Sequence, residues 1–342
     1  MKASDYFVID AHCHIGDPGI QDRIGAAGTA SPSVREVFES FEALQRHVGW
    51  NGGTAALGGS PGSYPALMKE SGTDFAVFAM LSFAEELGGV DLCPNEFLES
   101  LLADSPGAPY AAFAGVDPRL ADGVKRDLVR SLVRDRGFLG IKINPNDWGG
   151  FSLGDARLMP ILETCSELGA PVHVHTGYDP TGCIANGNPM LLEPAMIALP
   201  SLTVMLEHYG FPWKYQAYAL CRKYPRVYLT LALHFNALVH HNKALAWQEL
   251  EEMRIHAGLG KIVYGSDFPA SPNQAVVIRF LEKERVPRGL RAIGYPEWTH
   301  EMRARVLGLN AAEGLGIAHP RIDARKARFR KPAAPEGPTM RW

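Results

Sequence analysis

Two pairs of histidines, each with one residue between its members, are the most informative feature of this 342-residue sequence. His12 and His14 form the first pair, and His173 and His175 form the second. Residues two apart in a β-strand point to the same face, so each pair can turn two imidazoles toward one ion. Imidazole nitrogen binds Zn, Fe, Ni or Cu more readily than Mg or Ca. The spacing therefore indicates a metal site.

Two further candidates stand at the ends of apolar runs. His208 closes the run LTVMLEH, and Asp267 closes the run KIVYGSD. A histidine pair alone is weak evidence, because the chain contains 12 histidines. Position strengthens the evidence, since each candidate lies at the end of a run that is typical of a β-strand. These side chains would meet if the strands ended at one edge of a sheet.

Eight such runs alternate with segments of helical periodicity, and this alternation predicts parallel strands joined by helices. The expected strands are 6–10, 74–81, 110–116, 138–144, 171–175, 202–208, 226–231 and 261–267. The expected helices are 122–134, 155–168, 191–198, 213–224, 245–256, 273–283 and 301–315. Eight rounds favour a closed (β/α)8 barrel, whose active site lies at the carboxyl ends of the strands.

Two segments fall outside this rhythm. Residues 16–72 are rich in Gly, Ser and Pro and are longer than an ordinary connection, so we expect a lid with one helix around 34–46. We expect 1–318 to form one barrel domain that includes this lid insertion. The tail, 319–342, is rich in Lys, Arg and Pro, and we expect it to be extended, either disordered or wrapped on a neighbouring subunit.

Composition limits the partners. The chain has 34 Lys and Arg against 37 Asp and Glu, so it lacks the basic surface that binds nucleic acid. It contains no apolar run of about 18 residues, which argues against a membrane span. The amino terminus does not resemble a secretory signal, and the five cysteines are widely spaced. We therefore expect a cytoplasmic protein with reduced thiols and a small-molecule substrate.

Five motifs along the chain support a more specific interpretation. In order, they are DAHCHIG at 10–16, PVHVHTG at 171–177, LEHYG at 206–210, YGSDFP at 264–269 and RVLGLNAAEGLGI at 305–317. With this ordered set, the sequence resembles the amidohydrolase superfamily. Within the superfamily it is similar to the amidohydrolase-related branch that includes aminocarboxymuconate semialdehyde decarboxylase.

The resemblance implies roles for the candidate residues. His12, His14, His175 and Asp267 would hold one divalent metal ion, which is most often zinc in this branch. His208 would be the catalytic acid or base, and Asp267 would also move a proton. Three imidazoles and one carboxylate leave room at such an ion for a water molecule. Members of the family often dimerise, so the resemblance also suggests a homodimer.

The resemblance leaves the reaction open. The first expectation is non-oxidative decarboxylation of a small unsaturated or aromatic carboxylic acid. The alternative is hydrolysis of a lactone, amide or ester by a hydroxide that the metal holds. A third hypothesis is a barrel that binds a metal or ligand without turnover. Decarboxylases related to the resorcylate enzymes begin with a glutamate where this chain has His12, so the sequence departs from that group.

Other residues near the expected site have more than one interpretation. Asp10 faces the same way as His12 and is expected to orient an imidazole. Lys142 on the fourth strand is expected to be a structural or substrate-binding lysine, although some superfamily branches carbamylate such a lysine to bridge two metals. His173 lies a layer deeper than the metal, as a supporting or filling residue. His234, expected in a loop after the seventh strand, would either touch substrate or be solvated.

Overall fold

The computed structural model describes residues 5–16, 19–47, 64–82, 85, 87–104, 107–177, 182–271 and 274–323. The tail from 324 onward and parts of the 16–72 segment therefore lie outside the described residues. Within the described ranges the chain forms an eight-stranded sheet in which strands β1 to β8 follow one another in sequence order.

Every neighbouring pair of strands is parallel, and the first strand meets the end of the last. The strands are β1 Ile9–Cys13, β2 Phe75–Ala79, β3 Tyr110–Gly115, β4 Gly140–Ile143, β5 Val172–Val174, β6 Val204–Leu206, β7 Val227–Thr230 and β8 Ile262–Val263. The backbone N–H of Ala11 donates to the carbonyl of Tyr264 at 3.1 Å, and that of Asp267 donates to His12 at 2.7 Å. These bonds join β1 to the segment after β8, and they confirm the predicted (β/α)8 barrel.

Helices surround the strands. They are α1 Ile20–Ala30, α2 Pro32–His47, α3 Tyr64–Ser71, α4 Asn95–Asp104, α5 Asp122–Arg134, α6 Met159–Leu168, α7 Glu193–Ala198, α8 Lys214–Lys223, α9 Ala232–His241, α10 Lys243–His256, α11 Gln274–Lys283, α12 Arg288–Ala292, α13 His300–Ala304 and α14 Asn310–Leu315. The π-helical turn Arg305–Leu309 joins the last two. In α5, Val129 and Leu132 lie three residues apart and are both buried, as expected for a helix that turns one face to the barrel.

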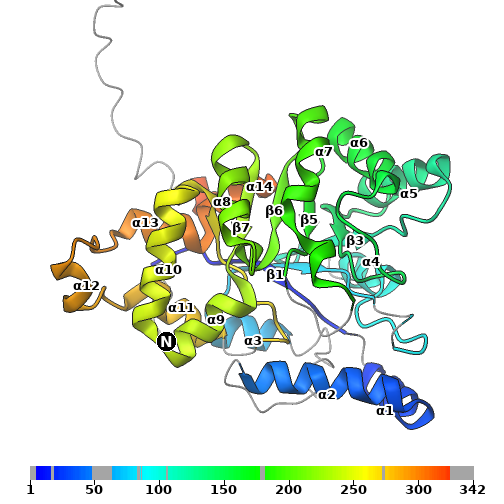
Figure 1. Cartoon of the computed structure of the whole chain (residues 1–342), viewed down its shortest axis with the longest axis horizontal. Coiled ribbons are helices and arrows are strands. Elements are labelled where there is room, and N and C mark those ends of the chain that lie inside the picture. Colours follow the sequence, from blue (N-terminus) through cyan, green and yellow to red (C-terminus); the bar gives the residue numbers. More distant parts are fainter. Residues whose placement is uncertain are drawn as a thin grey trace, which may run out of the picture.

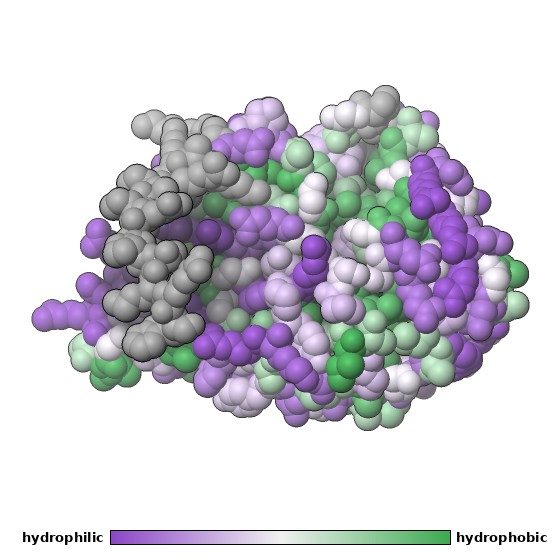
Figure 2. Space-filling view, turned by 90° about the horizontal axis from the view of Figure 1, so that it is seen from above, coloured by the Kyte–Doolittle hydropathy of each residue, from purple (hydrophilic) through white to green (hydrophobic). Residues whose placement is uncertain are grey.

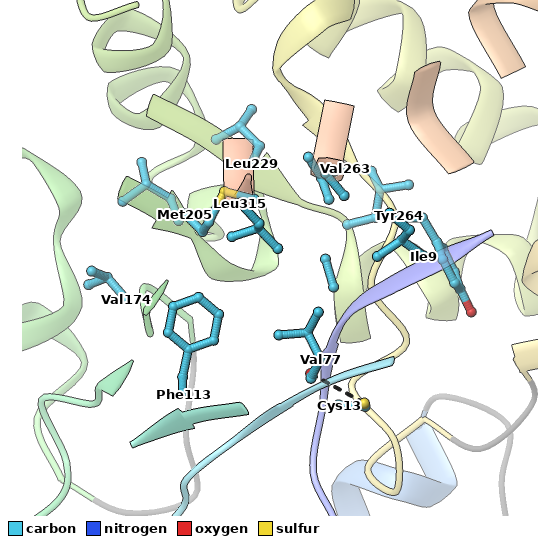
Figure 3. Packing of buried hydrophobic residues seen from close by; sticks show 14 of the residues in the cluster. Ile9, Cys13, Val77, Phe113, Val174, Met205, Leu229, Val263, Tyr264 and Leu315 are labelled. Carbon is cyan, nitrogen blue, oxygen red and sulfur yellow. Dashed lines mark hydrogen bonds between the residues drawn. The ribbon is translucent and has the colours of Figure 1, made fainter. Parts of the chain in front are cut away.

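Strand β5 alternates between two kinds of buried side chain. In β5, Val172 and Val174 belong to the hydrophobic core, whereas His173 between them contacts polar groups inside the barrel. Figure 3 shows core side chains from several strands packed together, among them Val174. The Phe113 ring lies 5.0 Å from the His173 ring, so apolar packing begins directly beside the polar groups.

Several strand boundaries differ from the prediction. β1 begins three residues later than expected and includes His12, because the bonds to the segment after β8 extend the strand beyond its apolar run. β6 and β8 end before His208 and Asp267, which lie in the turns that follow. The expected loop after the seventh strand is also wrong, because this segment forms α9.

The segment between β1 and β2 contains more helix than the sequence predicts. The helix expected at 34–46 is present as α2, but α1 and α3 were not expected. Gly25 and Gly28 lower the helix propensity of α1, and packing against neighbouring elements offsets this. Helices α1 and α2 lie side by side, outside the ring of barrel helices (Figure 1).

Within the described ranges, none of the helices has both the length and the apolar character needed to cross a membrane. On the face drawn in Figure 2, hydrophilic and hydrophobic residues are interspersed.

The first residues of the predicted tail form a helical turn instead of an extended chain. There Arg321 pairs with Asp74 at 2.5 Å, so the start of the tail packs on its own barrel.

Candidate metal centre

The structure brings His12, His14 and Asp267 together at the carboxyl ends of β1 and β8. All three are buried, and one possible ligand atom from each lies within 4.8 Å of the others. His12 Nε2 and His14 Nε2 are each 3.5 Å from Asp267 Oδ1. With metal–ligand bonds of about 2.0–2.2 Å, ligand atoms of a tetrahedral site lie about 3.3–3.6 Å apart. The three side chains therefore fit a single metal ion.

The surroundings of the His12 and His14 imidazoles suit both rings to this role, in different ways. His14 Nδ1 lies 2.8 Å from the carbonyl of Ala79, to which it can donate, and this leaves the Nε2 lone pair directed at Asp267. Neither ring nitrogen of His12 has a hydrogen-bond partner among the described residues. Burial holds the pKa of His12 well below its usual value, so the ring is neutral. A buried imidazole without hydrogen bonds is costly, and a metal ligand would have this character.

His175 and His208 form the opposite side of the cluster. His208 Nε2 lies 3.3 Å from His175 Nδ1, and the two ring centres are 4.8 Å apart. His175 follows β5 and contacts His208. It is not one of the three residues, His12, His14 and Asp267, whose possible ligand atoms lie close together. Its role as a fourth ligand therefore stays a prediction.

Two glycines of the motifs are explained by the close approach of imidazoles. A Cβ atom on Gly177 would lie 2.4 Å from Cδ2 of His208, and one on Gly265 would lie 2.8 Å from Cβ of His12. Real Cβ atoms do not come this close to such atoms, so a larger residue would displace the rings. The glycines of HTG and YGSD thus make room for the site.

His208 and Asp267 have left-handed backbone conformations, with φ of 53° and 55°. Such conformations cost of order 1–2 kcal/mol for residues other than glycine, and they are found preferentially at functional sites. They also turn both side chains into the barrel mouth directly after their strands. The backbone strain supports a functional role for both residues.

Their surroundings shift the pKa values of His208 and Asp267 from their usual values toward each other. Burial, together with His175, lowers the pKa of His208 well below its usual value. Burial raises the pKa of Asp267, although His14 opposes this. His208 Nδ1 lies 3.9 Å from Asp267 Oδ2, so a proton could pass between them after a small movement.

Asp10, in β1, lies beside the turn that follows β8. Its carboxylate accepts hydrogen bonds from the backbone N–H of Ser266 at 2.8 Å and from the side-chain amide of Gln274 at 3.3 Å. These bonds connect β1 to the turn that carries Asp267. Burial raises the pKa of Asp10 to about 7. The expected role of Asp10 in orienting an imidazole stays a prediction.

Glu207 was missed by the sequence analysis, yet it lies in the middle of the cluster. Its Oε1 contacts Lys142 Nζ and His173 Nδ1, and its Oε2 lies 3.5 Å from His12 Nε2. Burial would raise the pKa of Glu207, but the imidazoles of His12 and His173 and the ammonium of Lys142 hold it well below its usual value. One signal was available, namely an acidic residue next to His208 in LEHYG.

The remaining candidates surround this group. His173 Nε2 lies 3.1 Å from the carbonyl of Ala11, one layer below the metal candidates. His234 lies in the first turn of α9, with its ring centre 5.9 Å from that of His208 and 4.1 Å from that of Phe211. Cys13 points away from the site, as expected, and its thiol donates to the carbonyl of Val77 at 3.4 Å (Figure 3).

No curated protein matches the sequence, but many solved structures do. The 5-carboxyvanillate decarboxylase of Sphingomonas paucimobilis shares 16% identity at a TM-score of 0.62, over 92% of this chain and 100% of that one. The 5-carboxyvanillate decarboxylase of Novosphingobium aromaticivorans, solved with manganese, shares 16% sequence identity at a TM-score of 0.59. The match covers 92% of this chain and 97% of that one. A candidate 2-pyrone-4,6-dicarboxylic acid hydrolase of Pseudomonas putida shares 18% sequence identity at a TM-score of 0.54. That match covers 91% of this chain and 98% of the other.

At such identities the solved structures show a common fold. The family assignment comes from the sequence itself. A family model described as amidohydrolase matches residues 9–317, a range that contains every residue of the candidate metal centre. The chain therefore belongs to the amidohydrolase family.

Proposed function

We propose that this chain is a metal-dependent, non-oxidative decarboxylase of a small unsaturated or aromatic carboxylic acid. The observation that carries the proposal is the convergence of His12, His14 and Asp267 at one end of the barrel, with His208 beside them. His208 Nδ1 has no hydrogen-bond partner among the described residues, so it is available to a substrate. The family and the structural relatives agree with this chemistry.

Zinc is the proposed metal, held by His12, His14, His175 and Asp267. A donor set rich in imidazole favours zinc over magnesium or calcium. Manganese is the first alternative to test, because one structural relative was solved with it. A divalent cation in this position would polarise the substrate and stabilise the negative charge that develops as CO2 leaves.

His208 would handle the proton. Decarboxylation breaks the bond between the substrate carbon and its carboxylate, and the electron pair stays on that carbon. A proton must then be added at the same atom. His208 Nδ1 would deliver this proton and regain one from Asp267, which lies 3.9 Å away.

The alternative is hydrolysis of a lactone, amide or ester by the same residues. The observation that favours it is the raised pKa of Asp267, which suits a carboxylate that accepts a proton from an attacking water. Asp267 would then pass this proton to the leaving oxygen or nitrogen. A candidate pyrone hydrolase among the structural relatives agrees with this possibility.

Product analysis separates the two reactions. The chain, loaded with zinc or manganese, is incubated with aromatic acids, unsaturated acids and pyrone lactones. Release of CO2 from an acid supports decarboxylation, whereas a product heavier by one water supports hydrolysis. If metal-loaded protein turns over nothing in the panel, the binding-only hypothesis replaces both.

Alanine variants test the assigned roles. We expect His12→Ala to lose most of its bound metal, because a ligand is removed. We expect His208→Ala to keep its metal while turnover falls by about 10²- to 10⁴-fold, the usual contribution of a general acid or base. Plasma mass spectrometry measures the metal content. Full occupancy after loss of both His12 and His14 would contradict the proposal.

The lid assigned to 16–72 is also proposed to cover this site. Helices α1 and α2 form a small hydrophobic cluster with Leu87, Val90 and Leu92, which follow β2 on the mouth side. Substrate or product should therefore slow hydrogen exchange of amides in α1 and α2. Unchanged exchange at saturating ligand would count against the lid.

A further inference from the structure

Glu207 is a buried carboxylate that the proposed reaction does not use. Its two oxygens have different surroundings. Oε1 contacts Lys142 Nζ and His173 Nδ1. Oε2 instead faces ring nitrogens, at 3.5 Å from His12, 3.3 Å from His175 and 3.8 Å from His208. The side chain is thus held by one oxygen while the other points at the candidate metal centre.

A role as simple counter-ion to Lys142 does not account for this arrangement. A buried lysine needs an acceptor, and Oε1 alone meets that need. Of the three ring nitrogens near Oε2, only His175 Nδ1, at 3.3 Å, is close enough to donate a hydrogen bond, whereas those of His12 and His208, at 3.5 and 3.8 Å, are not. The three distances are close to the spacing of about 3.3–3.6 Å between ligand atoms that share one metal ion. His12, Glu207 and His208 also form a second group in which possible ligand atoms lie within 4.8 Å of one another.

We propose that Glu207 Oε2 is a further ligand of the metal and that Lys142 and His173 position it through Oε1. This inference rests on the metal centre of the proposed function. His12 belongs to both groups of possible ligands, so it would connect Glu207 to His14 and Asp267. A second carboxylate raises the coordination number and adds a hard oxygen donor, and both changes favour Mn²⁺ more than the imidazoles alone would.

The charges of the cluster agree with this role. Lys142 and Glu207 are a buried pair, with 1% and 0% of their side chains exposed. A dication held by Asp267 and Glu207, beside the Lys142 ammonium, would leave one net positive charge. One carboxylate of the substrate would neutralise that charge. The site would therefore be suited to a substrate that presents one carboxylate to the metal.

The test measures metal affinity in Glu207→Gln, which keeps the shape of the side chain and removes its charge. We expect Mn²⁺ affinity, measured by competition with a chelator, to fall about 100-fold, the upper end of losses seen even for groups that only orient ligands. In the Co²⁺-loaded variant, the visible absorption bands should intensify because the coordination number falls. Affinity within threefold of the wild type together with an unchanged cobalt spectrum would overturn the proposal.

The double variant Lys142→Met/Glu207→Gln separates a ligand from a counter-ion, and it leaves neither charge buried alone if the single variant fails to fold. If Glu207 only neutralises Lys142, the double variant should regain wild-type Mn²⁺ affinity, which would overturn the proposal. If Glu207 is a ligand, the affinity should stay low. Glu251→Gln is the matched control, because Glu251 is a buried carboxylate that pairs with Arg254 on α10. A wild-type chain that binds neither Zn²⁺ nor Mn²⁺ would overturn the proposed function as well, whereas an unaffected Glu207→Gln would overturn only this inference.

Discussion

Two lysines are equally buried in this barrel but lie in different settings, with 1% of each side chain exposed. Lys125 belongs to α5, in the outer layer of the molecule. Its ammonium donates to the carbonyls of Pro118 at 3.1 Å and Arg157 at 2.8 Å, and it pairs with the exposed Asp122. Lys142 belongs to β4 and contacts the fully buried carboxylate of Glu207 inside the barrel.

The difference shows what each region requires. In the outer layer, backbone carbonyls are sufficient acceptors, and Lys125 connects two loops without any buried anion. Inside the barrel, a buried anion accompanies the lysine, which is a costly arrangement for stability alone. Such a pair is better explained by a requirement for a carboxylate at that place. Lys125 is therefore interpreted as structural, and Lys142 as part of the functional site.

The largest effect that tests this comparison is expected for Lys142→Met. The variant leaves Glu207 buried without its ammonium partner, and breaking a buried pair in this way costs about 3–5 kcal/mol. Urea unfolding in the presence of a chelator measures this loss without a contribution from metal. A Lys142→Met chain as stable as the wild type would remove the distinction between the two lysines.

The matched change, Lys125→Met, should have a smaller effect. It leaves two carbonyls without a donor but no buried charge unpaired, which costs about 1–3 kcal/mol. Because Lys125 lies outside the metal centre, metal affinity and turnover should remain at wild-type values. A loss of metal from Lys125→Met, measured by plasma mass spectrometry, would show that the outer layer also shapes the site.

The fold was predictable from the sequence because each strand carries its own apolar run. Errors arose where contacts between distant residues extend or end an element. β1 reaches Cys13 through bonds to residues more than 250 positions away, such as that between His14 and Phe268. The helix α9 was missed because it begins almost directly after β7. The sequence shows no clear boundary between the apolar residues of the strand and those of the helix.

The site was predictable only in part. His12, His14 and Asp267 could be found because each ends an apolar run and belongs to a motif. Glu207 was missed although it stands next to His208 in LEHYG, because Lys142 is 65 residues away and side-chain alternation would place Glu207 and His208 on opposite faces of a strand. Strand β6 ends at Leu206, and the positive φ of His208 in the following turn brings its ring beside Glu207. No strand pattern predicts such a turn.

The smallest predicted effect concerns Asp155. It lies beside Arg157, whose backbone carbonyl accepts a hydrogen bond from Lys125. Its carboxylate accepts hydrogen bonds from the guanidinium of Arg157, at 2.6 Å for the shortest, and from the backbone N–H of Arg157 at 2.9 Å. The bond to the guanidinium lowers the pKa of Asp155 below its ordinary 3.8. A carboxylate with a lowered pKa in the folded state adds stability above pH 3.8, and this contribution is lost as the pH falls through the lowered value.

Asp155→Asn removes the charge but keeps an oxygen that can accept the backbone bond. The melting temperature should fall slightly between pH 5 and 8, by less than for Lys125→Met, because both partners are near solvent and such pairs are weak. The difference from the wild type should shrink as the pH falls below 3.8 and through the lowered pKa of Asp155, and also in high salt. A difference that persists below this lowered pKa, measured by thermal unfolding, would mean that the backbone bond, and not the charge, connects Asp155 to the acceptor of Lys125.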